Sequence, residues 1–222
     1  MLREWDMNRV SDGKRYHRDD MVEAGCDDCR GCSDCCQGMG DTIVLDPYDM
    51  YRLTSHLKCS AEALMNKQLE LTLVDGVALP SLKMSEEGRC FFLNKEGRCD
   101  VHSARPGICR LFPLGRIYEE NGFSYFLQIH ECTKGEHTPV RVSEWLDTPN
   151  MKKYEKYIGE WHSFLLAWQR QVHETTDENV KRQTVMYLLM QFFFKSYQAT
   201  EDFYPQFYAR LEEARELIGG QS

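Results

Sequence analysis

Five cysteines fall within eleven residues near the N-terminus, and this spacing constrains the chain more than any other feature. The stretch from Cys26 to Cys36 reads Cys-Asp-Asp-Cys-Arg-Gly-Cys-Ser-Asp-Cys-Cys. Only Asp, Ser, Arg and Gly separate the thiols, so the loop is too polar for core but flexible enough to fold around a soft metal or a cluster. The stretch therefore predicts one wall of a metal site.

Length and charge narrow the class of protein. A chain of 222 residues can bury a core without covalent staples, so the thiols are not needed simply to hold it together. A formal net charge of -8 and a pI of about 5.4 argue against attraction to nucleic acid or an anionic membrane. We expect neither as a partner, and the sequence leaves the protein partner or substrate unknown.

The compartment follows from what the chain lacks. Its first twenty residues contain no apolar core of a secretory signal, and no stretch approaches the roughly 18 apolar residues of a membrane span. We expect a soluble cytoplasmic protein. In that reducing compartment, the ten cysteines are better explained as metal ligands or redox thiols than as disulfides, which remain the structural alternative.

The N-terminal part of the chain predicts short elements. Residues 1–25 read as an irregular arm or short helix. Asp46-Pro47 predicts a capped helix through about Leu57, and Ser60 caps a second helix that ends near Glu70. Two β-hairpins follow, one spanning residues 71–79 around Asp75-Gly76 and one spanning residues 114–129 around Asn121-Gly122.

The C-terminal part predicts helices. Apolar residues recur at helical steps after Thr148-Pro149, and two further helices are expected over residues 177–197 and from about Asp202 to Gly219-Gly220. Their aromatic stripe could bind a partner, but helical spacing favours ordinary core. We predict an α+β fold in which a cysteine-rich metal-binding region, residues 1–141, packs on a helical region, residues 142–222.

A second set of cysteines lies between and beyond the predicted hairpins. It comprises Cys90, Cys99, Cys109 and Cys132. Turns can point such side chains inward from several directions. A closed site needs this, because four thiolates surround zinc tetrahedrally at about 2.3 Å and a cubane cluster takes one thiolate per iron.

These residues resemble the YkgJ-type cysteine-cluster family, the CxxCxxCC zinc- or iron-chelating proteins. The resemblance rests on the first motif Cys29-x-x-Cys32-x-x-Cys35-Cys36, on Cys90-Phe-Phe-Leu followed by Cys99, and on Arg105-Pro106-x-x-Cys109-Arg110-x-Phe112-Pro113. It covers roughly residues 26 to 135. It implies a metal site with ligands from Cys29, Cys32, Cys35, Cys36, Cys90, Cys99, Cys109 and Cys132.

We predict an iron–sulfur cluster, of the 4Fe–4S type, with a redox or group-transfer role. The alternative is a zinc-binding structural or interaction module. The family also resembles the N-terminal part of flagellin lysine N-methylases, which makes a protein-lysine methylase a weaker alternative; the chain lacks a glycine-rich nucleotide loop after a strand. The eight thiols could form two four-ligand sites, or one cluster with thiols left over.

Other residues near the motifs are candidates of lower rank. Cys26 allows a second register, Cys26-x-x-Cys29-x-x-Cys32-x-x-x-Cys36, which imitates a bacterial ferredoxin and would leave Cys35 spare. The roles of two sets of residues stay open. Three histidines could join the ligands: His102, His130 and His137. Three arginines could either bind anions or support the site structurally: Arg105, Arg110 and Arg116. Cys59 is expected to be a buried or free thiol, and Asp27, Asp28 and Asp34 to be solvated.

Overall fold

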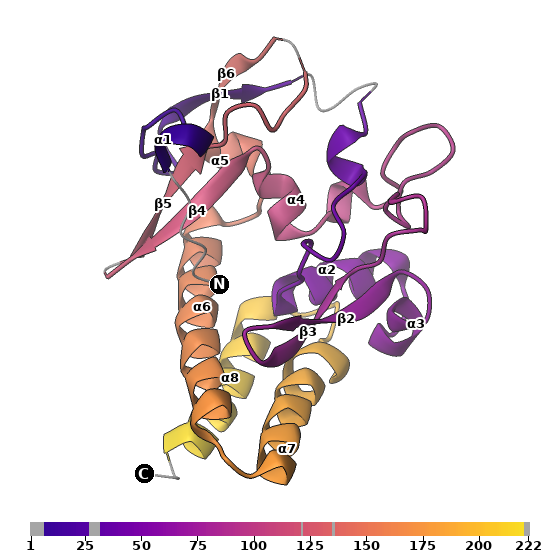
Figure 1. Cartoon of the computed structure of the whole chain (residues 1–222), viewed down its shortest axis with the longest axis vertical. Helices are drawn as coiled ribbons and strands as arrows, with labels where there is room; N and C mark the ends of the chain where they lie inside the picture. The colour runs from indigo at the N-terminus through magenta and orange to yellow at the C-terminus, as the bar shows by residue number, and fades with distance from the viewer. Residues whose placement is uncertain (1–6, 27–31, 121, 135, 220–222) are drawn as a thin grey trace.

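Short helices and paired strands form the first two thirds of the molecule, and long helices form the last third (Figure 1). The computed structural model describes residues 7–26, 32–120, 122–134 and 136–219. In this part of the chain, three antiparallel two-stranded sheets pair β1 (Met21–Gly25) with β6 (Thr138–Arg141), β2 (Leu69–Val74) with β3 (Val77–Leu82), and β4 (Leu114–Glu119) with β5 (Gly122–Leu127). The α+β class predicted from the sequence is confirmed.

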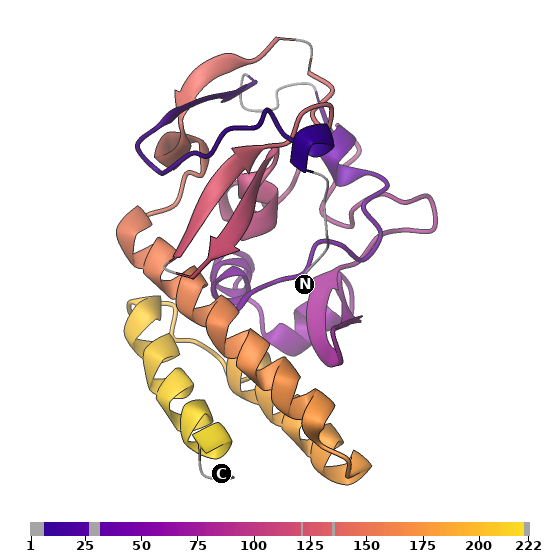
Figure 2. The same ribbon diagram turned by 60° about the vertical axis from the view of Figure 1, so that its left-hand side comes forward.

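The helices divide into two sets by their place in the chain. Those before residue 150 are α1 (Met7–Val10), α2 (Pro47–Leu57), α3 (Ala61–Met65), α4 (Gly107–Leu111), α5 (Val142–Trp145) and the 3-10 turns η2 (Asp34–Cys36) and η3 (His102–Ala104). The C-terminal ones are α6 (Met151–Glu174), α7 (Glu178–Leu189), the π-helical turn η4 (Met190–Phe194) and α8 (Phe203–Gly219). After rotation, α6 is seen as a long diagonal rod that reaches from the β4–β5 hairpin to the turn before α7 (Figure 2).

The helix α2 begins as its sequence predicts. Asp46 accepts a hydrogen bond from the Asp49 backbone N–H at 2.9 Å, and the Asp49 side chain accepts one from the Asp46 N–H at 3.2 Å, which makes a reciprocal capping box before Pro47. Ser60 caps α3 as expected. The predicted end of α3 near Glu70 is wrong, because the helix stops at Met65 and β2 begins at Leu69.

The two predicted hairpins are present, and one differs in register. Asp75 and Gly76 have φ angles of 47° and 83°, so they form the two-residue turn between β2 and β3. In the second hairpin, Glu119 pairs with Gly122, so Gly122 is the first residue of β5 rather than part of the turn. Asn121 lies outside the described residues.

The strand pair β1–β6 was not predicted. The sequence suggested an arm or short helix over residues 1–25, and α1 is that short helix, but Met21 to Gly25 then pairs antiparallel with residues 138–141. The pairing joins segments more than a hundred positions apart. It places the start of the Cys26–Cys36 stretch beside the chain that follows Cys132.

The C-terminal helices follow the prediction with one exception. Asn150 caps α6 and Asp177 caps α7. The helix expected over residues 177–197 changes at Met190 into the π-helical turn η4, whose carbonyl at Gln191 accepts from the buried Arg210 at 2.9 Å. In the described part of the chain, no helix has both the length and the apolar character to cross a membrane.

Two apolar clusters form the core. The larger one joins the β2–β3 hairpin and α2 to the three C-terminal helices, and it includes Phe92 and Val101 from the cysteine-bearing segment. The smaller one lies under β4–β5, β1–β6 and α5, and includes Val22, Tyr125 and Val142. The division at residues 141 and 142 stays a prediction, since the larger cluster draws on both sides of it.

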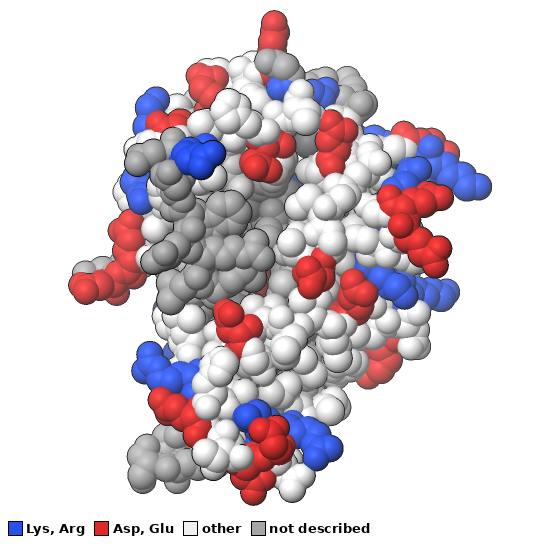
Figure 3. Space-filling view, viewed as in Figure 1, with Lys and Arg blue, Asp and Glu red and all other residues white. Residues whose placement is uncertain are grey.

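Acidic and basic side chains are interspersed at the edges of the face drawn in Figure 3, and several acidic groups stand alone on it. On the face drawn in Figure 3, blue and red groups lie next to one another, and the described side chains there form no continuous basic patch. This distribution agrees with the net charge of -8.

Candidate metal centre

The two cysteine-bearing segments lie against each other. The Cys90 backbone N–H donates to the Cys36 carbonyl at 2.9 Å, and the Gly38 N–H donates to the Gly88 carbonyl at 2.8 Å. Residues 37 and 89 form an isolated antiparallel bridge between these bonds. The end of the N-terminal loop is therefore laid along the strand-like segment that leads to Cys90.

The next two cysteines are positioned by short local structure. Leu93 and Cys99 form a bridge that closes a tight loop after Cys90, with Gly97 at a φ angle of 72°. Helix α4 carries Cys109, and it begins directly after Pro106. Turns and a one-and-a-half-turn helix thus present thiols from separate directions toward Cys35 and Cys36.

The pKa shifts of the thiols indicate which of them lie within electrostatic reach of one another. Burial raises the pKa of Cys90, Cys99 and Cys109, and nearby thiolate charges raise it further: Cys35 acts on Cys90, Cys90 acts on Cys99, and all three act on Cys109. We call Cys35, Cys36, Cys90, Cys99 and Cys109 the central thiol group.

The adjacent pair Cys35 and Cys36 is linked internally. A hydrogen bond from the Cys36 thiol lowers the pKa of Cys35 from 9.0 to about 7, and the positive charge of Arg105 acts in the same direction against the effect of burial. The same hydrogen bond raises the pKa of Cys36, and burial and the charges of Cys35, Cys99 and Cys109 add to it. Cys35 is therefore the thiol of this pair that ionises first.

A second set of thiols lies around Cys132. Burial raises the pKa of Cys132, and the charges of Cys26, Cys32 and Cys35 raise it further. The Thr133 hydroxyl also donates a hydrogen bond to the Asp34 carboxylate, which holds the Cys132 segment to η2. We call Cys26, Cys32 and Cys132 the outer thiol group.

Of the eight predicted ligands, the central group contains five and the outer group two. Cys29 lies outside the described residues, as do Asp27 and Asp28. Among the described residues, no three Cys, His, Asp or Glu side chains already converge closely enough to hold one ion. The donor set is nevertheless chemically suited to zinc or an iron–sulfur cluster, because thiolates are the soft ligands that both prefer.

The histidine candidates are not gathered among these thiols. The His102 ring contacts the Arg105 guanidinium, with Nδ1 3.2 Å from Nη1. His130 is exposed at a φ angle of 71°. The Nε2 atom of His137 is buried and makes no hydrogen bond to a described residue.

The three arginines around Cys109 differ in their contacts. Arg110 is buried and donates to the Thr148 hydroxyl at 2.6 Å, and Arg116 donates to the Tyr154 hydroxyl at 2.9 Å, so both support the structure. Arg105 acts electrostatically on the thiols, because its charge lowers the pKa of Cys35 and Cys99.

Sequence reasoning missed Asp49. This carboxylate is 1% exposed, accepts a hydrogen bond from the Gly107 N–H at 2.7 Å, and lies 3.9 Å from the Arg110 guanidinium. It therefore fixes the start of the helix that carries Cys109. Burial, together with the charge of Asp46, raises the pKa of Asp49 to about 7. The capping-box spacing of Asp46 and Asp49 was a signal for a helix start but not for this second contact.

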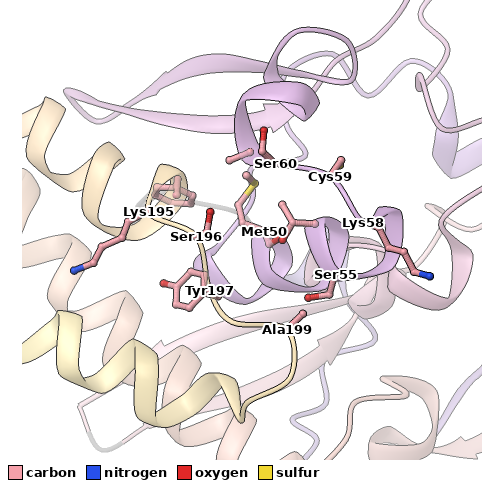
Figure 4. A pocket seen from close by; sticks show the side chains of 12 residues that line it. Met50, Ser55, Lys58, Cys59, Ser60, Lys195, Ser196, Tyr197 and Ala199 are labelled. Atoms are coloured by element: carbon pink, nitrogen blue, oxygen red, sulfur yellow. The ribbon is translucent and has the colours of Figure 1, made fainter.

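Cys59 lies apart from both thiol groups. It sits between α2 and α3 and lines a cavity of about 460 Å³ together with Met50, Ser60 and Tyr197 (Figure 4). Lys58 and Lys195, at the edges of this cavity, extend in opposite directions. Burial raises the pKa of Cys59.

One comparison with known protein families matches the thiol-bearing region. Residues 28–136 match the CxxCxxCC family, whose description reads "Putative zinc- or iron-chelating domain". This region belongs to the CxxCxxCC family. The resemblance predicted from the motifs is confirmed, and the CxxCxxCC domain contains the central thiol group, Cys32 and Cys132, whereas Cys26 lies just before it.

No curated protein and no solved structure shows a significant match to the chain. The metal-binding character of the CxxCxxCC domain therefore rests on the family match.

Proposed function

We propose that the CxxCxxCC domain holds an iron–sulfur cluster and that the protein acts in electron or group transfer. The observation that supports this most directly is the central thiol group, in which residues from two segments more than fifty positions apart lie within electrostatic reach of one another. Such a concentration of partly buried thiols would be unfavourable as thiolates without a metal.

The ligands we propose are drawn from the eight family cysteines. Cys36, Cys90, Cys99 and Cys109 could hold the cluster, with Cys35 as the fifth thiol of the central group. Cys29, Cys32 and Cys132 could supply a second metal or complete the first. Each iron of a cubane takes one thiolate, and the bound cluster supplies one-electron transfer.

The number of thiols exceeds what one metal centre needs. A closed zinc site and a cubane cluster each use four thiolates, whereas the central group has five and the outer group adds three more. Arg105 would stabilise the negative charge of thiolates and sulfide, since it already lowers the pKa of two of these thiols.

Anaerobic purification followed by iron, zinc and sulfide analysis tests the proposal. We expect iron and inorganic sulfide in stoichiometric amounts and an absorption band near about 400 nm, which thiolate-ligated clusters give and zinc with its filled d shell does not. Stoichiometric zinc without sulfide would instead support the alternative, a zinc-binding structural or interaction module of the same domain.

The location and the partner are part of the proposal. A reducing cytoplasm would keep the ten thiols available for metal. A protein partner or substrate would exchange electrons or a chemical group with the centre. A protein-lysine methylase remains the weaker alternative, to be tested by methyl transfer to lysine-containing proteins with the centre intact.

A further inference from the structure

A second cavity, which contains no cysteine in its lining, lies next to the thiol-bearing region. It has a volume of about 570 Å³, within the range of about 300–1,000 Å³ that small-molecule sites occupy. Its walls come from α2, η3, the start of α6 and the start of α8. Because α2 and η3 lie within residues 28–136, part of the cavity wall belongs to the CxxCxxCC domain, but the cavity shares no proposed ligand.

One wall of this cavity is aromatic. The rings of Tyr48 and Tyr51 have centroids 6.1 Å apart and an interplanar angle of 21°, and those of Tyr48 and Tyr204 are 5.9 Å apart at 19°. Three tyrosine rings therefore lie close to parallel. A flat ring is the ligand group that such a wall accommodates best, because it can stack or pack edge-on at similar spacing.

The same cavity has an excess of positive charge. Arg52, Lys153 and His56 line it, against the single carboxylate of Asp202, which pairs with Lys153 at 2.9 Å. The lining therefore contains one arginine, Arg52, that no lining carboxylate pairs with. A monoanionic ligand would balance it, whereas a phosphate dianion would bring more negative charge than the lining offsets.

The guanidinium of Arg52 has hydrogen-bonding capacity left over. Its Nη2 donates to the Ser103 carbonyl of η3, and its Cζ lies 5.9 Å from the centre of the Tyr48 ring. Its Nη1 is shielded from solvent and has no hydrogen-bond partner among the described residues. Burial and the nearby charge of Arg110 lower the pKa of Arg52 against the opposing effects of Tyr48, Asp49 and Asp147, so a further anion would stabilise this group.

We propose that this cavity binds a small organic anion in which a carboxylate is attached to a flat ring. Arg52 pairs with the carboxylate, and the ring packs against Tyr48, Tyr51 and Tyr204. The planar guanidinium can offer two parallel N–H donors to a carboxylate. Nη1 is enclosed in the unliganded cavity, so binding requires the guanidinium to turn toward the open side. This proposal does not depend on which metal the thiols hold.

Binding of benzoate to the full-length protein tests the proposal, measured by titration calorimetry at constant ionic strength with benzyl alcohol and inorganic phosphate as comparison ligands. We expect saturable binding of benzoate, with benzyl alcohol and phosphate at least about tenfold weaker, because a charge-assisted hydrogen bond is worth more than a factor of ten. Absence of saturable benzoate binding, or equal binding of either comparison ligand, would overturn the proposal.

Two variants locate the binding. Arg52→Gln is expected to weaken benzoate binding at least about tenfold, and Arg52→Lys, which keeps the charge but loses the two-donor geometry, to give an intermediate affinity. Arg170→Gln, at an exposed position of α6 outside the cavity, is the matched control and should bind as the unaltered protein. Near-UV circular dichroism checks that each variant is folded. Wild-type affinity in a folded Arg52→Gln or Arg52→Lys variant would overturn the assignment.

Metal and sulfide content, measured on the same samples, separates the two proposals. Benzoate binding without an iron–sulfur centre would contradict only the proposed function. An intact centre without benzoate binding would contradict only the ligand cavity.

Discussion

The cysteine-bearing part of the molecule and the helical part are held together by different means. In α6, η4 and α8, buried rings pack directly: Tyr157 and Phe207 have centroids 4.6 Å apart, and Trp161 and Phe192 are 5.1 Å apart. Between residues 84 and 111, short turns, single bridges and the five-residue helix α4 surround partly buried thiols.

The difference in packing indicates that the cysteine-bearing part has fewer stabilising apolar contacts than the helical part. Burial of a large aromatic side chain such as Phe contributes roughly 1.5–3 kcal/mol to the free energy of folding. Apolar packing alone can therefore stabilise the helical part. Isolated bridges and very short helices contribute little without tertiary support. We infer that metal binding supplies much of the stability of the cysteine-bearing part and little of that of the helices.

Metal removal tests this contrast and should have the largest effect. After treatment with a strong chelator under reducing conditions, we expect amide hydrogen exchange to accelerate at least about tenfold in residues 84–111, because metal binding and folding of such a site are linked. Exchange in the centres of α6 and α8 should change much less. Equal acceleration in both parts would show that the metal stabilises the molecule as a single unit.

Replacement of one thiol narrows the test to the proposed ligands. Cys109→Ser should weaken metal binding by more than about 100-fold and lower the thermal midpoint, since losing a ligand costs more than the 10–100-fold loss typical of an outer-sphere partner. The control is Cys59→Ser, because Cys59 lies apart from both thiol groups. Chelator competition and calorimetry measure both quantities, and equal results for the two variants would refute the assignment of Cys109.

Asp49 joins α2 to the cysteine-bearing helix α4 and gives the next largest effect. Asp49→Ala would leave the Gly107 N–H without its acceptor and Arg110 as a buried cation without its carboxylate, which should cost about 3–5 kcal/mol. Urea unfolding at pH 8, above the pKa of about 7 at which this carboxylate ionises, measures the loss.

A second capping carboxylate provides the control for Asp49. Asp177 accepts from the Asn179 N–H at 2.8 Å at the exposed start of α7, so Asp177→Ala should cost only about 1 kcal/mol. If the two alanine variants lose the same stability, Asp49 acts only as a helix cap, and its contact with α4 adds nothing.

Gly107 should give a smaller, steric effect at the same junction. A Cβ atom at this position would lie 2.8 Å from the Tyr154 hydroxyl oxygen, so Gly107→Ala forces a shift and should cost about 1–3 kcal/mol. At Gly159 in α6 a Cβ atom meets nothing within 4 Å, and Gly159→Ala should be neutral or stabilising by up to about 1 kcal/mol. Urea unfolding of both variants decides, and a Gly107→Ala variant as stable as Gly159→Ala would contradict the close packing at Tyr154.

Local signals predicted most of the fold. Asp46-Pro47 marked the start of α2, and Asp75-Gly76 marked a turn, because backbone geometry at these positions depends on the residues themselves. The β1–β6 pair could not be found this way. Its partners are more than a hundred residues apart, and the strand Met-Val-Glu-Ala-Gly has little β-typical composition.

Prediction of the metal site from local sequence signals meets the same limit. Spacing and flanking residues identified the cysteines, but not the separation into a central group and an outer group, which depends on how residues 37–38 lie against residues 88–89. The role of Asp49 also depends on tertiary contact, since Gly107 is 58 positions away. The cysteine ligands could therefore be predicted from the sequence, whereas the residues that lie next to each of them could be seen only in the fold.

The reactivity of the thiols tests the structure of the central thiol group without measuring stability. In the metal-free protein, iodoacetamide should modify Cys35 before Cys36, Cys90, Cys99 and Cys109, because the hydrogen bond from Cys36 lowers its pKa to about 7 while the pKa of the others is raised. The rate at Cys35 should rise with pH and reach half its maximum near pH 7, as measured by mass spectrometry of peptides.

Cys36→Ala removes the hydrogen bond, so this midpoint should move upward, whereas Cys59→Ala should leave it in place. If Cys35 reacts no earlier than its neighbours, the Cys35–Cys36 hydrogen bond is not formed in the metal-free protein, and the central group is ordered only by the metal.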